Sequence, residues 1–298
     1  MSRSIAALEL RGATVFITGA ARGIGAAAAE RLHARGANVA LVGLEPERLS
    51  ANAQRLGERA AFFEADVTDL DALRGAVEGT VARFGAIDVA IANAGVAFEG
   101  ALATEPVEHV ERTLAVNLMG VWRTDRAVVE QLISSRGYLL NISSLSAVAH
   151  LPLMGPYTAA KAGVEAMTDA LRMELAHQGV SVGCAYFGFI DTDLVRASYA
   201  RPSASLLNAD TPAFLRDPAP LHRAIDVIER GVLARSSRLW YPRWVGPALA
   251  LRGVLQPLIE RRMLGEQEQL AEAIRLAEAD SGQAAEDPVL GVAAAAIR

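Results

Sequence analysis

The stretch Thr14-Val-Phe-Ile-Thr-Gly-Ala-Ala-Arg-Gly-Ile-Gly25 decides the fold of this chain. Its first five residues are apolar or β-branched and predict a buried strand, and the alanine-rich residues that follow predict a helix. Three glycines fall at the turn between them. Glycine lets the backbone approach a diphosphate closely, and the helix N-terminus adds free amides and a positive dipole, so the turn predicts a nucleotide site. The candidate binding residues of this turn are Gly19, Arg22, Gly23, Ile24 and Gly25.

The same alternation of strand and helix continues along most of the chain. Nearly continuous hydrophobicity in the short runs is typical of parallel strands covered on both faces. Right-handed crossovers between such strands build a doubly wound α/β sheet, so we expect a seven-stranded parallel sheet of the Rossmann type in one domain, residues 1–241. The expected strands are Thr14–Thr18, Asn38–Val42, Ala60–Phe63, Ile87–Ala92, Gly137–Ile142, Val180–Ala185 and Arg238–Tyr241. The expected helices are Ile24–Arg35, Pro46–Leu56, Leu70–Phe84, Val107–Ser134, Tyr157–His177 and Thr192–Tyr199.

The second half of the chain departs from this alternation in two places. Four prolines between Ala200 and Pro220 indicate a mobile loop or a broken helix. Residues 242–298 form a C-terminal helical tail, in which Gln267–Ala279 predicts a polar helix and Ala284–Arg298 is expected to fray. Residues 242–262 are apolar but interrupted by arginine and proline. Three roles are open for them: a lid over a ligand pocket, a subunit interface, or an amphipathic segment on a membrane surface, and the lid or the interface is the expected one.

The bulk composition excludes several classes of protein. The 298 residues carry a formal net charge of −5 and a pI near 5.6, which argues against the basic face of a nucleic-acid-binding protein. The single cysteine, Cys184, excludes an intramolecular disulfide, and the five histidines show no metal-ligand spacing, so no metal site is expected. The N-terminus does not read as a signal peptide, and no apolar run reaches the ~20 residues of a membrane span. We therefore expect a cytoplasmic protein without a transmembrane segment.

One short motif carries a specific chemistry. Lys161 is the only lysine among 29 lysine and arginine residues, and it follows Tyr157 by four positions. Residues four apart share a face of a helix, so the ammonium can approach the tyrosine hydroxyl. A nearby positive charge favours the phenolate and lowers the pKa of a tyrosine. We therefore expect Tyr157 to act as a general acid or base.

These motifs occur in an order that resembles the short-chain dehydrogenase/reductase superfamily, over roughly Leu10 to Tyr241. The resemblance implies a nicotinamide-dependent oxidoreductase that interconverts an alcohol and a ketone or aldehyde. It also implies that Tyr157 transfers the proton, that Lys161 stabilises the phenolate and binds ribose hydroxyls, and that Ser144 positions the substrate oxygen. Asn117 has two open roles, holding a water beside the lysine or making a hydrogen bond between helices. The motifs are Thr18-Gly-x-x-x-Gly23-Ile-Gly25, Asn93-Ala-Gly95, Asn117, Ser144 and Tyr157-x-x-x-Lys161.

The resemblance extends the cofactor site to three further segments. Asp66 follows the third strand, and it contacts the adenine, caps the next helix, or does both. Asn93 either lines the cofactor crevice or only steadies the sheet. Phe187 replaces the proline that family members commonly have after the sixth strand. The candidate cofactor-binding residues of these segments are Asp66, Val67, Asn93, Ala94, Gly95, Gly188, Ile190 and Thr192, together with Tyr157 and Lys161.

The cofactor is expected to be NAD(H) or NADP(H), with a lean to NAD(H), although the end of the second strand carries neither of the usual signatures. Relatives that prefer NAD usually carry an acidic residue at the position of Gly43, and relatives that prefer NADP often carry arginine at the position of Leu44. Neither signature is present. Arg22 could meet a phosphate, while Glu45 is close enough to repel one or merely caps the helix that begins at Pro46.

The expected substrate is a small-molecule alcohol or carbonyl compound. By the resemblance, residues 189–220 form the substrate loop, and their apolar side chains favour a hydrophobic compound. The same side chains would also suit a mobile helix packed on its own core. The family resemblance further implies a homodimer or homotetramer. The alternative function is a nonenzymatic regulator that binds a nicotinamide nucleotide on the same fold.

Overall fold

A computed structural model of the chain describes residues 7–207, 209 and 211–281, and the expected frayed segment Ala284–Arg298 lies outside them. The seven strands form one parallel sheet in the order β3-β2-β1-β4-β5-β6-β7, which confirms the doubly wound fold. The chain reverses its direction of winding between β1 and β4, and ligands bind at such a switch point in open α/β sheets. The strands are β1 (Thr14–Thr18), β2 (Asn38–Gly43), β3 (Ala60–Glu64), β4 (Val89–Ala92), β5 (Tyr138–Ile142), β6 (Ser181–Phe187) and β7 (Arg238–Tyr241).

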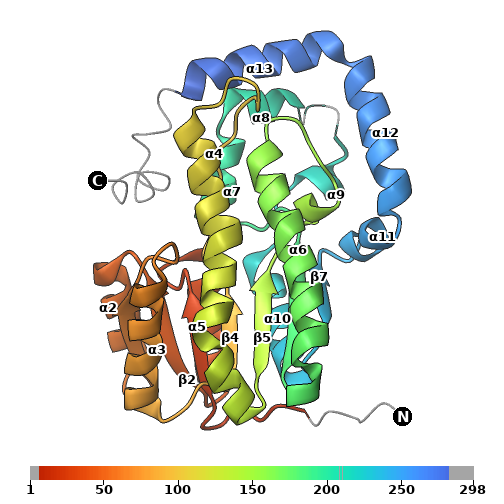
Figure 1. Cartoon of the computed structure of the whole chain (residues 1–298). Helices are drawn as coiled ribbons and strands as arrows, with labels where there is room; N and C mark the ends of the chain where they lie inside the picture. Colours follow the sequence, from red (N-terminus) through yellow and green to blue (C-terminus); the bar gives the residue numbers. More distant parts are fainter. Residues whose placement is uncertain (1–6, 208, 210, 282–298) are drawn as a thin grey trace.

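Helices cover both faces of the sheet. On one face α1, α2 and α10 pack against the strands through a core that contains Leu32, Leu49 and Ile228. On the other face, which is turned forward in Figure 1, α3, α5 and α6 pack through a core that contains Leu73, Leu132 and Leu175. These helices are α1 (Gly23–Ala34), α2 (Pro46–Leu56), α3 (Leu70–Phe84), α5 (Gly120–Ser135), α6 (Gly155–Leu175) and α10 (Leu221–Ala234).

The structure refines the predicted elements in three ways. The expected long helix Val107–Ser134 is α4 (Val107–Leu114) joined to α5 through one π-helical turn, Ala115–Met119. The proline-rich stretch is a broken helix that contains α8 (Pro202–Leu207) and α9 (Ala213–Arg216), after α7 (Asp193–Tyr199). Helix α10 is not among the predicted helices, although Ile225, Ile228 and Val232 give it an apolar face at helical spacing.

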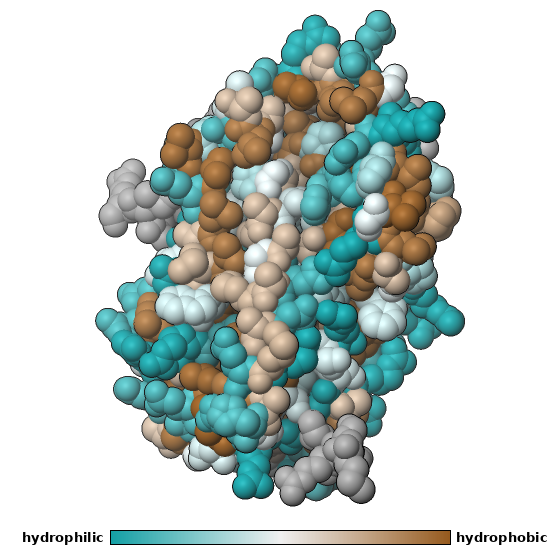
Figure 2. All heavy atoms as spheres, turned by 45° about the vertical axis from the view of Figure 1, so that its right-hand side comes forward, coloured by the Kyte–Doolittle hydropathy of each residue, from teal (hydrophilic) through white to brown (hydrophobic). Residues whose placement is uncertain are grey.

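The described part of the tail, residues 242–281, forms three helices that run from the edge of the sheet to the top of the molecule (Figure 1). They are α11 (Val245–Ala250), α12 (Arg252–Gly265) and α13 (Gln267–Ser281). Leu251, Val254 and Leu258 expose about three fifths of their surface, at 60%, 61% and 59%. Apolar side chains accordingly gather over the upper half of the face shown in Figure 2. Among the described residues, no helix has the length and hydrophobicity that crossing a membrane requires.

Candidate functional site

The glycine turn after β1 has the geometry of an anion cradle. Gly19 and Gly23 adopt positive φ angles of 65° and 56°, which favour glycine. A Cβ atom on Gly19 would lie 2.8 Å from the Cα of Ala94, and one on Gly25 would lie 2.3 Å from the oxygen of Gly19. The residue before α1, Arg22, makes no side-chain hydrogen bond to the first amides of the helix. These amides and the helix dipole therefore favour an anionic ligand at this turn.

Arg22 and Glu45 form a bidentate ion pair beside this turn. The Arg22 Nε atom donates to Glu45 Oε1 over 2.9 Å, and Nη2 donates to Oε2 over 2.6 Å. Glu45 makes no side-chain cap on α2, so the capping role is wrong for its side chain. Both residues line the cleft next to Gly43 and Leu44. A ligand bound at the end of β2 therefore lies next to Glu45 and to Arg22, whose positive charge is balanced by that carboxylate.

Asp66 faces the same cleft from the end of β3. Its carboxylate accepts hydrogen bonds from the backbone N–H of Thr68 at 2.8 Å and from Nη2 of Arg112 at 3.3 Å. Burial opposes ionisation of this carboxyl, but the Thr68 hydrogen bonds and the Arg112 charge outweigh burial and lower its pKa. The α3 cap is Asp69, which accepts from the N–H groups of Asp71 and Ala72, so Asp66 does not cap that helix.

Asn93 ties the glycine turn to the end of β4. Its Nδ2 atom donates to the carbonyl oxygens of Thr18 at 3.0 Å and Gly19 at 3.2 Å. Its own N–H donates to the hydroxyl of Thr18 over 3.0 Å. These contacts give Asn93 the sheet-steadying role, while Asn93, Ala94 and Gly95 also line the cleft.

Asn117 is fully buried in the π-helical turn between α4 and α5. Its Nδ2 atom donates to the carbonyl oxygen of Val96 over 2.7 Å, and its Oδ1 atom accepts from the N–H of Val96 over 2.8 Å. Asn117 therefore fixes the loop that follows β4 and does not itself line the cleft. π-Helical turns are frequent at functional sites, and this one allows a buried asparagine inside a long helix.

Ser144 and Tyr157 meet at the carboxyl end of β5. The Ser144 hydroxyl accepts from the N–H of Ser146 at 3.1 Å and donates to the carbonyl oxygen of Phe187 at 3.4 Å. Ser144 and Tyr157 line the same cleft, and the neighbouring Ser144 hydroxyl favours the phenolate form of Tyr157. Ser143, by contrast, donates its hydroxyl to the carbonyl oxygen of Lys161 over 2.9 Å and so stabilises the backbone of α6. This difference favours Ser144 as the serine that faces a substrate.

Lys161 is 4% exposed and lies deep in the same cleft. Its Nζ atom donates to the carbonyl oxygen of Ile142 over 2.9 Å and lies 5.6 Å from the centre of the Tyr157 ring. Burial lowers the pKa of Lys161 to about 8. Burial also raises the pKa of Tyr157, so the prediction that its pKa is lowered is wrong for this arrangement. The reason is that desolvation of the phenol outweighs the influence of the Ser144 hydroxyl, although Tyr157 still lines the cleft.

The loop after β6 closes the cleft opposite the glycine turn. A Cβ atom on Gly188 would lie 3.1 Å from Cδ of Pro242, so a side chain there would crowd the tail. Thr192 donates its hydroxyl to the carbonyl oxygen of Ile190 over 3.2 Å and caps α7 by accepting from the N–H of Val195 over 3.4 Å. Phe187, which stands in place of the common proline, is 4% exposed and belongs to the core under this loop.

The cleft has a volume of about 280 Å³ and gathers nearly all of the predicted residues. The exceptions are Gly25, which packs against the glycine turn, and Asn117. Sequence reasoning missed Arg112, which projects from α4 to Asp66. Only the sign of its charge, opposite to that of Asp66, could have suggested this pair. Within the described part of the chain, no group of three or more His, Cys, Asp and Glu side chains is placed to hold a metal ion.

These residues fit a nicotinamide dinucleotide. The free amides of α1 and the close backbone at Gly19 would hold the diphosphate, and Asp66 with Val67 would flank the adenine. Lys161 lies where an ammonium could reach ribose hydroxyls, next to Ser144 and Tyr157. A nicotinamide ring held at this end of the cleft would lie next to Ser144 and Tyr157. A substrate carbonyl bound there could then receive a hydride at carbon and a proton at oxygen.

Comparison with curated proteins agrees with this geometry. The chain is 33% identical over 189 residues to the 3-oxoacyl-[acyl-carrier-protein] reductase FabG of Chlamydia trachomatis, which covers 62% of this chain and 76% of the relative. It is 30% identical over 202 residues to 3beta-hydroxysteroid dehydrogenase 1 of Eggerthella lenta, which covers 66% of this chain and 77% of the relative.

Solved structures share the fold. A 3-ketoacyl-(acyl-carrier-protein) reductase from Brucella melitensis, complexed with NADH, matches with a TM-score of 0.69 and 23% identity over 78% of this chain and 97% of that chain. An alcohol dehydrogenase from Thermococcus sibiricus, complexed with 5-hydroxy-NADP, matches with a TM-score of 0.67 and 24% identity over 76% of this chain and 95% of that chain. At these identities the likeness establishes the fold alone.

The sequence profile described as short chain dehydrogenase matches residues 13–202, which include the glycine turn, Ser144, Tyr157 and Lys161. The chain therefore belongs to the short-chain dehydrogenase/reductase family and is an NAD(P)-dependent oxidoreductase that acts on CH–OH groups.

Proposed function

We propose that this enzyme interconverts a hydrophobic alcohol and its ketone or aldehyde, with NAD(H) as the preferred cofactor. One observation carries the proposal. Ser144, Tyr157 and Lys161 line the same cleft as the glycine turn, so a proton-transfer group stands at the far end of a dinucleotide site. The proposal also rests on family membership, which supplies the reaction class.

The cofactor, when bound, supplies or accepts the hydride. In reduction Tyr157 donates its proton to the carbonyl oxygen, and in oxidation its phenolate removes the hydroxyl proton. The Ser144 hydroxyl donates a hydrogen bond to the same substrate oxygen and stabilises the developing charge. Lys161 holds a positive charge beside Tyr157 and binds ribose hydroxyls. Asn117 keeps the loop at Val96 in place on the cofactor side of the cleft.

The preference for NAD(H) follows from the Arg22–Glu45 pair. NADP(H) carries an additional 2′-phosphate on the adenosine ribose, next to the end of β2 in this fold. That phosphate would approach the Glu45 carboxylate, which is already bound to the nearest arginine by two hydrogen bonds. The ribose hydroxyl of NAD(H), in contrast, can donate a hydrogen bond to a carboxylate.

The substrate class follows from the side chains above Ser144 and Tyr157. Leu194 and Val195 of the lid helix α7 line the cleft. Farther from the sheet, Leu153, Leu206 and Leu207 pack together beneath α13. The relatives that match this chain include a protein named as a 3-oxoacyl-[acyl-carrier-protein] reductase and one named as a 3beta-hydroxysteroid dehydrogenase.

A panel of apolar ketones and secondary alcohols, followed by nicotinamide absorbance, tests the proposal. We expect turnover of at least one ketone with NADH, and a loss of at least about 100-fold in kcat for Tyr157→Phe, in which proton transfer is removed. The matched control is Tyr241→Phe, which removes a hydroxyl outside the cleft. Cofactor binding without turnover of any substrate would instead indicate a nucleotide-binding regulator.

A further inference from the structure

The segment that joins the two hydroxyl-bearing residues of the site, Leu145–Met154, lies under the C-terminal tail. This connecting segment begins directly after Ser144 and ends three residues before Tyr157, at the start of α6. Its orientation therefore sets how the serine and the tyrosine face each other. In Figure 1 the tail rises along one side of the molecule as α12 and crosses above α4 and α8 as α13.

Each tail helix holds a successive part of the connecting segment. Val245 of α11 is fully buried and packs in one cluster with Ala147 and Val148. Gln256 of α12 accepts a hydrogen bond from the N–H of His150 over 2.8 Å and donates to its carbonyl oxygen over 3.4 Å.

The last part of the connecting segment is held by α13. Leu153 is buried there against Ala273 and Ala277, which are 0% and 3% exposed. Its φ angle is 64°, an unfavourable value for a branched side chain. Such a backbone conformation persists only where neighbouring contacts hold it. In Leu153 it is held by packing against α13 and by a 3.0 Å hydrogen bond from the N–H of Gly100 to the Leu153 carbonyl oxygen.

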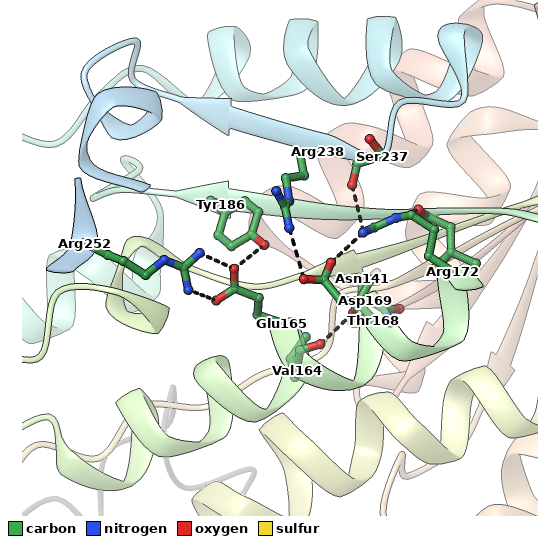
Figure 3. Close-up of polar contacts among 11 residues, drawn as sticks. Asn141, Val164, Glu165, Thr168, Asp169, Arg172, Tyr186, Ser237, Arg238 and Arg252 are labelled. Atoms are coloured by element: carbon green, nitrogen blue, oxygen red, sulfur yellow. Dashed lines mark hydrogen bonds and ion pairs between the residues drawn. The ribbon is translucent and has the colours of Figure 1, made fainter. Parts of the chain in front are cut away.

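One ion pair fastens the base of the tail to α6. Both terminal nitrogens of Arg252 donate to the Glu165 carboxylate, over 3.0 Å and 2.7 Å. Glu165 is 6% exposed and lies one helical turn after Lys161. The hydroxyl of Tyr186, on β6, donates to the same carboxylate over 2.9 Å, as Figure 3 shows. A buried carboxylate on the helix of the catalytic tyrosine therefore takes its positive partner from the tail.

We propose that the C-terminal tail is a clamp on the connecting segment and that Arg252 is a positioning residue, which acts through Glu165 to keep this clamp closed. The tail thereby fixes the relative placement of Ser144 and Tyr157. The cofactor side, at Gly19 and Asp66, is independent of the clamp. The inference rests on the proposed function only where it predicts a change in ketone turnover.

The test uses full-length variants, each with a matched control. Arg252→Gln opens the ion pair. Its control Arg238→Gln makes the same substitution in a single-contact, more exposed 3.0 Å pair from β7 to Asp169 on the same helix, without touching the tail (Figure 3). Ala273→Glu places a charge in the Leu153 cluster, and its control Ala271→Glu places the same charge on the exposed side of α13. Ala273→Glu leaves the buried Glu165 pair intact, so it tests the clamp even if Arg252→Gln folds poorly.

Amide hydrogen exchange is the first readout, because it needs no substrate. We expect exchange in Leu145–Met154 to quicken by at least about tenfold in Arg252→Gln and Ala273→Glu, and to stay unchanged in both controls. Arg252→Lys, which keeps a charged donor, should restore part of the protection. Unchanged exchange in the connecting segment of both clamp variants, or an equal rise in the controls, overturns the proposal.

Ligand measurements separate this inference from the proposed function. With the best ketone of the panel, we expect kcat of Arg252→Gln to fall by at least about tenfold, because a small misplacement of reacting groups is costly. The Kd for NADH should stay within about twofold of the parent value, since the glycine turn is untouched. Equal losses in kcat and NADH affinity would mean general unfolding and would reject a positioning role. A chain that binds no NADH refutes the proposed function, while the exchange result still decides the clamp.

Discussion

The ammonium of Lys161 donates a hydrogen bond to the carbonyl oxygen of Ile142 over 2.9 Å, inside a cleft that leaves the side chain 4% exposed. Burial lowers the pKa of this amine from its ordinary 10.5 to about 8. Below pH 8 the ammonium is present, and above pH 8 it is lost. The pKa of Tyr157 is raised, so the phenol keeps its proton over this range.

We therefore expect ketone reduction to decline as the pH rises through about 8, because the charge beside Tyr157 disappears. Since the chain contains one lysine, NMR with 13C placed at the lysine Cε will show a single labelled signal, and its shift against pH reads the pKa directly. A lysine signal that titrates near 10.5 would contradict the expected cause, even if the rate declined.

Lys161→Arg keeps the positive charge but should reduce kcat by at least about 100-fold. A planar guanidinium is larger than an ammonium, and the 2.9 Å contact with Ile142 leaves it no equivalent position. Arginine also stays charged at every accessible pH, so any remaining activity should lose the decline near pH 8. Near-normal turnover in this variant would show that the compact ammonium is not required.

Glu45→Gln should increase kcat/KM with NADPH by about tenfold, because it removes a negative charge and releases Arg22 for a phosphate. The effect on NADH should be a modest loss. Initial rates with both cofactors give the ratio, and Glu47→Gln, which removes the same charge from an exposed position outside the cleft, is the control. An unchanged ratio would mean that Glu45 does not set the cofactor preference.

Asp125→Asn should stabilise the protein at alkaline pH. Asp125 is 4% exposed and accepts a hydrogen bond from Asn141, and burial raises its pKa to about 8. A carboxyl with a raised pKa in the folded state contributes most below pH ~4, and this contribution is lost as the pH rises through 8. Asparagine carries no such loss, so the variant should gain on the order of 6 kcal/mol relative to the parent between pH 4 and pH 8, at about 1.4 kcal/mol for each pH unit.

Thermal unfolding of both proteins across this pH range measures the difference. The amide that Asp125→Asn introduces can donate a hydrogen bond where Oδ1 of Asp125 and Oδ1 of Asn141 are both buried without a hydrogen-bond partner. A constant difference in Tm from pH 4 to pH 8 would show that Asp125 does not titrate in this range.

The sequence predicted the parts of the site that depend on local spacing. The glycines of the turn after β1, and Tyr157 with Lys161 on one helix, are set by a strand–turn–helix pattern and by a four-residue spacing. The strands could be predicted because they are buried on both faces and their apolar runs are nearly unbroken. Helix α10 was missed even though its apolar spacing is present, because it follows a proline-rich stretch that reads as a loop.

Contacts between distant segments could not be predicted in the same way. Arg252 lies 87 positions from Glu165, and Arg112 lies 46 positions from Asp66. Neither pair has a periodic signal, because each exists only after the sheet and the tail have brought the two elements together. The direction of the Tyr157 pKa shift failed for a related reason, since it depends on how much water the folded cleft removes from the hydroxyl.

Because Lys161 is the only lysine of the chain, its chemical reactivity reports whether the active-site cleft is closed. Amine-directed reagents can modify one side chain of this protein, and the fold buries that side chain next to the end of β5. Acylation at position 161, or cleavage by a protease that cuts after lysine, therefore reports opening of the active-site cleft and almost nothing else. The mass of the peptide that contains residue 161 can thus follow occupancy and unfolding of the site in a mixture, with no probe residue engineered into the chain.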